Sequence, residues 1–568
     1  MGHDPAAALI GDRRVHAAIE EGKLARTRVA EGIPRQAIRY CLAAAGANWK
    51  DLECVAVATR PGRAWMRKAF FRARLAPFSP LRSAYFINKA AGELGRELNN
   101  LRILREMAGR PSAPVHAFDH HLCHASSAYF ASPHDRGLIV SLDEQGDGHC
   151  GFVGVGQGSS IRQLSAIPLP HSLGGAFTQV TSLLGFRPHS DEHKTQWLSL
   201  SGEPVLADMF MAMLRRHPQG PPKLNPAYFR RRFASELSFS DEFYRRAGIG
   251  LSEEVQSSPP QIPDSLRADI AASLQRACEV ILSNWLESLR KQTGERFLCL
   301  AGGLFLNPLL VSALERNTGF EQIFVQPAAG NEGTALGAAW LAWHQDSKRP
   351  RVEPISDPYW GPSYSNEEIK QVLDNCKASY RWCDSENQKI EAAVQLLQAG
   401  KIVAWFQGPG EFGPRALGNR SLLASPWSPY VKENLNDYVK HRESFRPFAL
   451  AVPEEDCAQY FDCTANARFM CTMATVKEPA RHLFDSSESA FISKQGLVRL
   501  HVVTRGANLL LWKLLKRCGQ NAPASMLVNT SFNLFGEPLV VSPRDAVRSF
   551  YCSGTDALVA GSFLLTKR

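Results

Sequence analysis

Three segments that begin as short apolar runs and continue into glycines limit the folds open to this chain. They are GLIVSLDEQGDG (137–148), RFLCLAGGLFLNPLLVSAL (296–314) and QIFVQPAAGNEGTALGAAWLAW (322–343). Apolar runs of about four to six residues bounded by glycine are typical of strands buried on both faces. Each segment is interpreted as a strand, a glycine turn and then a helix. The pattern predicts an α/β fold whose turns present backbone N–H groups to phosphate.

The length of 568 residues exceeds one ordinary core. A polar, proline-rich run near residues 345–360 marks a boundary, so we expect two units, 1–350 and 358–568. The second unit opens on a capping box, Ser365 followed three residues later by Glu368. Its strand-like runs are 401–406, 447–452, 496–503 and 525–532.

Composition excludes several classes of protein. Apolar residues make up 44% and charged residues 21%, as in globular proteins. The 13 cysteines include no CxxC pair, which argues against a disulfide framework or a zinc knuckle and favours reduced core thiols. No apolar run approaches the ~20 residues that span a bilayer, and no signal peptide is visible, so we expect a cytoplasmic protein.

The net charge of +10 is concentrated in one segment, residues 60–110, which holds 12 Arg and Lys. Because the same segment carries aromatic residues such as Trp65 and Phe70, it is compatible with an amphipathic face for a membrane surface or an anionic partner. The alternative is a solvated helical insertion. A nucleic-acid partner is not expected.

A candidate metal site begins in DHHLCHASSAYF (119–130), where His120 and His124 are four residues apart. On a helix this spacing places both imidazoles on one face, where they can share a divalent metal or simply pack. Asp143 follows at the carboxyl end of a predicted buried strand, where α/β sheets place ligands, although an Asx turn before Gly146 would also explain it. Two imidazoles and a carboxylate suit Fe(II).

Candidate phosphate-binding residues lie in both units. The glycine turns AGG (301–303), with Asn307, and GNEG (330–333) are suited to a nucleotide. In the second unit, QGPGEFGPRALGNRS (407–421) fixes the backbone around Arg415 and Arg420. Clustered arginines with Ser and Asn donors are typical of phosphate recognition, the alternative being surface ion pairs with Glu411, Glu443 and Asp437. The further members are Lys440, Arg442, Arg446, Arg499 and NTSFN (529–533).

At these residues the chain resembles the O-carbamoyltransferase family of the NodU and TobZ type. The resemblance runs in order along nearly the full length and includes HDPAAAL (3–9), HHLCHASSAYF (120–130), LDEQGDG (142–148), HSLGGAFTQVTSLLGF (171–186), AGGLFLN (301–307), GNEGTALGAA (330–339), GPRALGNRSLL (413–423), FRPFA (445–449) and NTSFNLFGEP (529–538). It implies an N-terminal domain of the actin/Hsp70 superfamily and a C-terminal YrdC-like domain.

The resemblance also implies an activity. The C-terminal site would make carbamoyl adenylate from carbamoyl phosphate and ATP, with Mg(II) accompanying ATP. The N-terminal site would pass the carbamoyl group to a hydroxyl of a small-molecule, sugar or natural-product acceptor. Members of the family often form homodimers.

The family's site positions fall on specific residues of this chain. The metal ligands would be His120, His124, Asp143 and Asn331, and His3 would take the acceptor's proton. ATP and the carbamoyl group would be held by Arg28, Gly174, Asn307, Asn331, Arg415, Arg446, Arg499 and Ser531. Two of these depart from the family pattern, because Asn331 replaces an Asp and Arg28 replaces a Lys.

The start of the chain departs as well. The family opens with a buried strand before the HD motif, whereas only Met1 and Gly2 precede His3. We therefore expect about ten residues to be missing or the assigned start to be late. Rival interpretations are a tRNA threonylcarbamoyl transferase and a non-enzymatic ATP-binding regulator of the actin/Hsp70 type. Hydrogenase maturation enzymes are a poorer match, because their acylphosphatase and zinc fingers are absent.

Overall fold

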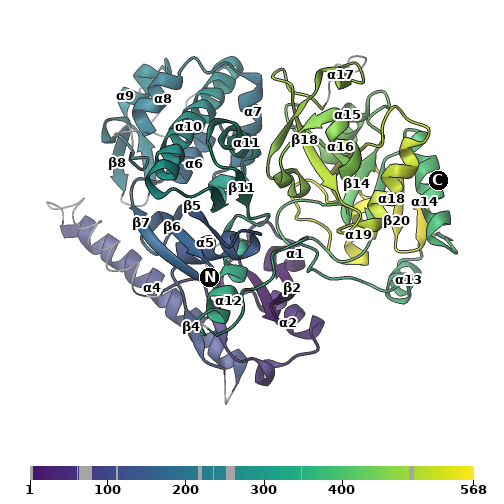
Figure 1. The fold of residues 1–568 in the computed structure, drawn as a ribbon, viewed down its shortest axis with the longest axis horizontal. Coiled ribbons are helices and arrows are strands. Elements are labelled where there is room, and N and C mark those ends of the chain that lie inside the picture. Colours follow the sequence, from purple (N-terminus) through teal and green to yellow (C-terminus); the bar gives the residue numbers. More distant parts are fainter. Residues whose placement is uncertain are drawn as a thin grey trace.

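The computed structural model describes residues 4–60, 62, 80–109, 113–214, 220–233, 236–250, 262–346, 348–484 and 491–567. These residues form a mixed α/β structure, as the sequence predicts. Elements up to α12 occupy one side of the molecule and elements from α13 onward the other (Figure 1).

The first half is built on a five-stranded sheet with the order β11-β10-β5-β6-β7. The first three strands, β11 (Gln322–Val325), β10 (Phe297–Ala301) and β5 (Arg136–Gly146), are parallel to one another. The last two, β6 (His149–Gln157) and β7 (Ser160–Pro168), continue the sheet antiparallel. Apolar side chains of β5 and β10 are fully buried, which places the core of this half at the centre of the sheet.

Helices cover this sheet on both faces (Figure 1). α5 (His120–Ala131) and α12 (Thr334–Trp343) pack on each other and lie on one face. α6 (Leu173–Leu183) and α10 (Asp264–Thr293) lie on the other. The remaining elements of this half are β1 (Ala6–Gly11), β2 (Arg14–Glu20), α1 (Glu21–Ala25), α2 (Arg35–Ala44), β3 (Val55–Val57), α4 (Pro80–Ala108), β4 (Val115–Ala117), α7 (Glu192–Leu198), α8 (Ala207–Leu214), β8 (Phe229–Phe233), β9 (Glu236–Phe239), α9 (Asp241–Arg246) and α11 (Pro308–Asn317).

Two of the three predicted strand–turn–helix segments are confirmed. β10 leads through Gly302 and Gly303 into α11, and β11 leads through the GNEG turn into α12. The prediction for 137–148 is wrong, because β5 turns directly into β6 as a hairpin. Asp147 (φ 47°) and Gly148 (φ 83°) both adopt left-handed backbone conformations, which is how an Asp-Gly pair closes a tight two-residue hairpin.

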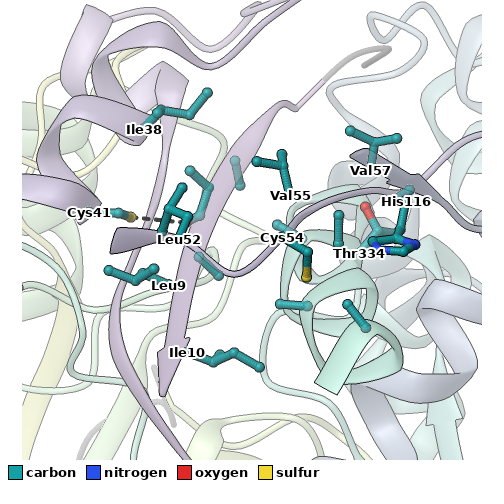
Figure 2. Close-up of a pocket in the computed structure, with 18 of the residues that line it drawn as sticks. Leu9, Ile10, Ile38, Cys41, Leu52, Cys54, Val55, Val57, His116 and Thr334 are labelled. Carbon is teal, nitrogen blue, oxygen red and sulfur yellow. Dashed lines mark hydrogen bonds between the residues drawn. The ribbon is translucent and has the colours of Figure 1, made fainter. Parts of the chain in front are cut away.

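One cavity of the first half lies between two strand edges. β1 pairs with β2 and β3 pairs with β4, and the opposite edges of β1 and β3 border a cavity of about 1110 Å³ over α12 (Figure 2). Consecutive residues of each strand line it, as expected where a strand presents its edge. His3 lies outside the described residues, so the expectation of a missing N-terminal strand stays a prediction.

The second half contains a ten-stranded sheet with the order β12-β21-β20-β13-β14-β19-β15-β18-β17-β16. The four predicted strands are confirmed as β13 (Val403–Phe406), β15 (Ala449–Pro453), β18 (Leu497–Val503) and β19 (Leu527–Ser531). The others are β12 (Arg381–Trp382), β14 (Arg420–Ala424), β16 (Phe461–Asp462), β17 (Met473–Val476), β20 (Ala557–Ala560) and β21 (Phe563–Thr566).

Alternate residues of these strands enter two separate cores, because successive side chains point to opposite faces. Phe406 and Val528 join the core under α13 (Asn366–Asn375) and α19 (Pro543–Tyr551). Trp405 and Leu527 join the core under α14 (Glu386–Gln398) and α18 (Leu509–Gly519). The predicted capping box of Ser365 and Glu368 is present at the start of α13.

Other sequence predictions have mixed outcomes. All 13 cysteines are free and most are buried, as expected for reduced core thiols. Among the described residues, no helix is both long and apolar enough to cross a membrane. The basic segment 60–110 lies partly outside the described residues, and its described part is mainly the helix α4. Its proposed membrane or partner contact therefore stays a prediction.

The close packing of α12 on α5 depends on Gly337, because a Cβ there would lie 1.8 Å from the carbonyl oxygen of Cys123. We expect Gly337→Ala to lower the free energy of unfolding by about 1–3 kcal/mol, measured by urea denaturation. The matched control is Gly95→Ala on α4, where a Cβ would meet nothing within 4 Å. Because alanine favours helix, this control should gain up to about 1 kcal/mol, and equal losses in both variants would contradict the packing argument.

Candidate active site

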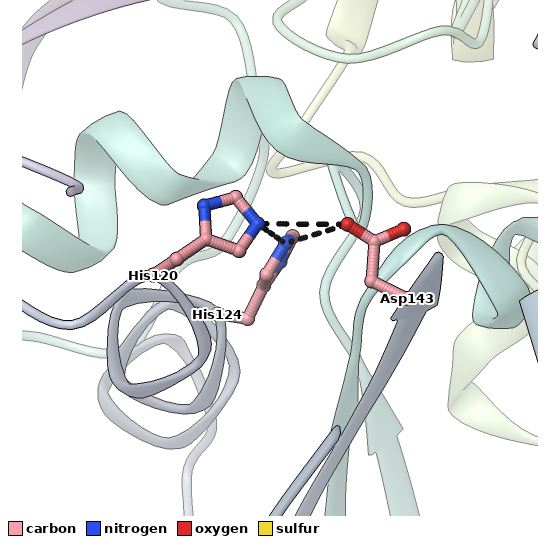
Figure 3. Close-up of side chains that lie close together, drawn as sticks. All are labelled: His120, His124 and Asp143. Atoms are coloured by element: carbon pink, nitrogen blue, oxygen red, sulfur yellow. Dashed lines mark hydrogen bonds and ion pairs between the residues drawn. The ribbon is translucent and has the colours of Figure 1, made fainter. Parts of the chain in front are cut away.

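The predicted metal cluster forms where α5 meets the end of β5 (Figure 3). His120 and His124 occupy successive turns of α5, and their Nε2 atoms are 3.2 Å apart. The Oδ2 atom of Asp143 lies 3.5 Å from the first nitrogen and 3.4 Å from the second. His121 points away and lies beside Ser141, as expected from the helical spacing.

The spacing of these three atoms fits a shared cation. Ligands about 2.1 Å from one ion, at angles between 90° and 110°, are separated by about 3.0–3.4 Å. The Nδ1 atom of His124 is buried without a hydrogen-bond partner among the described residues, so its ring is oriented by the cluster. Two imidazoles and one carboxylate are ligands that Fe(II) and similar divalent ions accept. The arrangement is therefore suitable for a metal ion.

The backbone holds this cluster firmly. Asp119 caps the start of α5 by accepting hydrogen bonds from His121 and Leu122 N–H. The carboxylate of Asp147, in the hairpin after β5, accepts the N–H of His120 at 2.9 Å. The start of α5 is therefore bonded to the hairpin that follows Asp143.

Electrostatics also favour binding of a cation. Burial alone would raise the pKa of Asp143, yet the hydrogen bonds from His120 and His124 hold it well below its usual range. Burial lowers the pKa of His124, while Asp143 and the Asn331 amide act against this shift. Asn331 therefore lies beside the cluster, at the position where the family resemblance places a fourth ligand. The carboxylate is ionised and the buried imidazole tends toward its neutral, ligating form.

A cavity of about 530 Å³ extends from this cluster into the interface between the two halves. Asp143 and Asn331 line one part of it. All the other predicted nucleotide and carbamoyl residues line it too, although they come from both halves, and they are Arg28, Gly174, Asn307, Arg415, Arg446, Arg499 and Ser531. The structure thus brings the predicted binding residues to one continuous cavity, while their ligands remain predictions.

The wall contributed by the second half is strongly positive. Nε and Nη2 of Arg499 and Nε of Arg446 are buried without hydrogen-bond partners among the described residues. Burial, with a further contribution from Arg415, holds the pKa of Arg499 well below its ordinary value. Burial and then the charges of Arg446, Arg28 and Arg415 likewise depress the pKa of His193. Arg446 also forms an ion pair of 3.7 Å with Glu443, as one alternative from the sequence expected. The guanidinium nitrogens that remain without partners are suited to bind an anion such as a phosphate.

Ser531 and its neighbours are positioned by buried polar contacts. The ammonium group of Lys440 donates to the carbonyl and hydroxyl oxygens of Ser531, and the hydroxyl donates to Asn533 Oδ1 at 2.8 Å. Asn529, two residues earlier on the same face of β19, donates from Nδ2 to Ala416 O and to His501 Nδ1. Its Oδ1 is buried without a partner among the described residues. The NTSFN pattern predicts hydroxyl and amide donors and gives no sign of this acceptor.

A contact between the halves, also missed from the sequence, positions the loop that carries Arg415. The buried Lys23 donates to the carbonyl oxygens of Glu411 and Gly413, both at 2.7 Å, and pairs with Glu20 at 2.9 Å. Glu20 Oε1 in turn accepts the N–H of Gly413 at 2.7 Å. The i,i+3 spacing of Glu20 and Lys23 could have predicted their ion pair. The bond from Lys23 to a backbone carbonyl 390 residues away could not be predicted from the sequence.

Several expectations for single residues need correction. Arg420 does not face a ligand, because it is 1% exposed and donates to the carbonyl oxygens of Gln407 and Pro362. Glu411 is not a surface ion partner, since its carboxylate accepts the N–H groups of Leu417, Asn419 and Arg420.

Other expectations stay open. Asn307 lines the cavity, but its amide also caps α11 through Leu310 N–H and donates to Gln275. His3 lies outside the described residues, so its predicted role as proton acceptor is untested.

The site therefore defines a class of protein in which the carboxylate of an imidazole–carboxylate cluster lines the same cavity as a cationic wall suited to anions. Comparison with known proteins agrees. Family models described as Carbamoyltransferase N-terminus and Carbamoyltransferase C-terminus match residues 1–340 and 394–567. The chain belongs to the carbamoyltransferase family and is an enzyme of that kind.

Similar proteins match the chain over its whole length or over about half of it. Protein sll1178 of Synechocystis sp. is 32% identical over 100% of this chain and 95% of its own length. Nodulation protein NolNO of Sinorhizobium fredii is 33% identical over 100% of this chain and 79% of its own. A 3'-hydroxymethylcephem-O-carbamoyltransferase of Streptomyces clavuligerus is 33% identical over 51% of this chain and 52% of its own.

The Glu20–Lys23 contact yields a stability prediction. Lys23→Met removes the donor from two carbonyl groups and leaves Glu20 buried without its counter-ion, so we expect the free energy of unfolding to fall by about 3 kcal/mol in urea denaturation. The control is Lys401→Met, which breaks a half-exposed pair with Asp556 and should cost at most about 1 kcal/mol. A similar small loss in both variants would show that the contact contributes little.

Proposed function

We propose that the chain is an ATP-dependent O-carbamoyltransferase. It makes carbamoyl adenylate from carbamoyl phosphate and ATP and transfers the carbamoyl group to a hydroxyl of a small-molecule, sugar or natural-product acceptor. The observation that carries the proposal is one cavity that Asp143 and Asn331 of the candidate metal cluster share with Arg446 and Arg499, whose guanidinium groups keep buried nitrogens without hydrogen-bond partners among the described residues. The O-carbamoyltransferase named among the similar proteins supports a hydroxyl acceptor.

Adenylate formation is assigned to the wall of the second half. Arg415, Arg446 and Arg499 offer fixed donors to the phosphates of ATP and carbamoyl phosphate, and Mg(II) accompanies ATP. Because these guanidinium groups are already in place and poorly solvated, they stabilise charge on the transferring groups without reorganising. Ser531 and the unpartnered Oδ1 of Asn529 add a hydroxyl and a hydrogen-bond acceptor suited to the carbamoyl amide.

Transfer is assigned to the cluster of the first half. His120, His124, Asp143 and Asn331 would hold a divalent ion, Fe(II) by their ligand chemistry. Such an ion supplies Lewis-acid stabilisation to a phosphate leaving group. The protein's own contribution is to fix the imidazoles on α5 and the carboxylate on β5. Arg28, Gly174 and Asn307 line the route between the cluster and the arginine wall.

The fold-level inferences follow the same resemblance. Residues 1–350 form an actin/Hsp70-superfamily domain and residues 358–568 a YrdC-like domain, in a cytoplasmic protein that forms a homodimer. The competing function is a non-enzymatic ATP-binding regulator, which would bind ATP without releasing pyrophosphate when carbamoyl phosphate is added. The enzyme is favoured because arginines of the second half and Asp143 and Asn331 of the candidate metal cluster line one cavity, an arrangement that ATP binding alone does not require.

The two half-reactions can be separated by mutation. We expect Arg415→Ala to reduce pyrophosphate release from ATP and carbamoyl phosphate at least 100-fold, because a fixed charge-stabilising donor is lost. His120→Ala should keep the first burst of pyrophosphate and instead slow carbamoyl transfer from the adenylate. The control is Arg296→Ala, an exposed residue paired with Glu321 far from the cavity. Equal loss of both half-reactions in each site variant would contradict the scheme.

Metal binding gives a separate prediction. We expect about one divalent ion per chain by elemental analysis, and its loss in His124→Ala. Asn331→Asp should bind the ion more tightly, because it adds a negative ligand. The same variant should destabilise the metal-free protein, since buried Glu332 already lies near Asp4 and Glu20, and burial raises the pKa of Glu332 to about 8. Unchanged metal content in His124→Ala would remove His124 from the ligand set, and unchanged metal affinity in Asn331→Asp would remove Asn331.

A further inference from the structure

Two thiols outside the cavity lie in contact in the second half, where α16 (Glu454–Tyr460) is found (Figure 1). Cys457 belongs to α16 and Cys463 directly follows β16, and their Sγ atoms are 3.4 Å apart. Cys457 is buried, whereas Cys463 is only half-buried. The two sulfur atoms are therefore neighbours, and one of them can be reached from solvent.

The backbone between the two thiols is held in place. Phe461 pairs with Val476 of the neighbouring strand β17. The N–H of Lys477 donates to Tyr460 O at 3.0 Å, and its ammonium group donates to Ala458 O. Because these contacts keep the cysteines facing each other, small rotations of the side chains can bring the sulfurs to the separation of about 2.05 Å that a disulfide requires.

The pair divides into an attacking thiol and a resolving thiol. The contact with Cys457, with a smaller contribution from Lys477, lowers the pKa of Cys463 against the opposing effect of burial. The same contact, together with burial, raises the pKa of Cys457. A half-buried thiol with a lowered pKa is the form that reacts with oxidants, and a neighbouring thiol then closes the disulfide.

Cys463 directly precedes a segment that connects the two halves. The hydroxyl groups of Thr464 and Thr472 and the amide of Asn466 all donate to the carboxylate of Glu315, on α11 of the first half. The segment from Thr464 to Thr472 therefore forms a joint between the halves. A covalent bond at Cys463 would attach the start of this joint to α16.

We propose that Cys457 and Cys463 form a reversible disulfide when the reduced protein meets a peroxide, and that this bond fastens the joint. The inference is independent of the function proposed for the cavity, because neither cysteine lines it. A disulfide here is a modification of a reduced protein rather than part of a disulfide framework.

The reaction has two steps. The Cys463 thiolate attacks one oxygen of hydrogen peroxide, the O–O bond breaks, and the sulfur becomes a sulfenic acid while hydroxide leaves and takes up the proton that Cys463 released. The Cys457 sulfur then bonds to the Cys463 sulfur, the S–O bond breaks, and the oxygen leaves as water with the proton of Cys457. The two thiols lose two electrons and the peroxide becomes two waters, and a dithiol reductant restores both thiols.

The test uses the full-length protein, first reduced and then treated with hydrogen peroxide. We expect peptide mapping to find a disulfide between Cys457 and Cys463 with a mass loss of about 2 Da, and dithiothreitol to recover both thiols. Hydrogen exchange at the joint should slow about tenfold in the oxidised protein, because the bond restricts local opening. The matched control is Cys376→Ala, which removes an exposed thiol at the end of α13 and should leave the disulfide yield unchanged.

Single variants separate the two thiols. Cys457→Ala should replace the disulfide by sulfenic and sulfinic acid at Cys463, whereas Cys463→Ala should leave the buried Cys457 reduced. Two thiols that stay reduced in the treated wild-type protein, a disulfide to another cysteine, or a sulfinic acid at Cys463 beside a free Cys457 would overturn the site. Unchanged exchange at the joint once the disulfide has formed would overturn its fastening role.

Discussion

The burial of more positive charge than the neighbouring Glu443 can balance is the constraint on which the rest of the site depends. The Nε atoms of Arg446 and Arg499 are buried and have no hydrogen-bond partner among the described residues. Lys440 is also buried, and its pKa is lowered by burial and by the charges of Arg442 and Arg446. Taking such groups out of water is costly. The structure supports them with the sheet that fixes the backbone of Arg499 in β18 and with contacts such as Glu20–Lys23 that hold the facing half in place. An anionic substrate would offset this cost on binding, so stability and function are linked through one cavity.

Local signals made much of this architecture predictable from the sequence. Buried strands, the Ser365 capping box and the i,i+4 spacing of His120 and His124 each depend on neighbouring residues, and the structure contains all three. The 137–148 segment failed because its apolar run and glycines suit a hairpin as well as a strand–helix turn. The Asp147-Gly148 pair was the decisive feature, since it favours a two-residue hairpin turn.

The parts that could not be predicted depend on contacts between distant segments. Arg415 and Arg420 stand in one loop and look equivalent in the sequence, yet one lines the cavity and the other is 1% exposed and bonded to carbonyl groups. Lys23 and Gly413 meet only because the two halves face each other. Side-chain chemistry indicated an anion and a metal site, whereas the assignment of each arginine required the tertiary structure.

The uneven distribution of charge along the cavity explains why an amide rather than a carboxylate stands at position 331. Asp143, Glu332, Asp4 and Glu20 already gather near the metal cluster, and burial together with Asp4 and Glu20 keeps Glu332 protonated near neutral pH. A further carboxylate at position 331 would add repulsion in a poorly solvated place, whereas an amide oxygen adds a ligand without charge. The opposite wall is cationic, and burial together with its arginines lowers the pKa of His193 well below the usual value of a histidine. Anionic groups are therefore attracted to the arginine wall, and a cation to the acidic end.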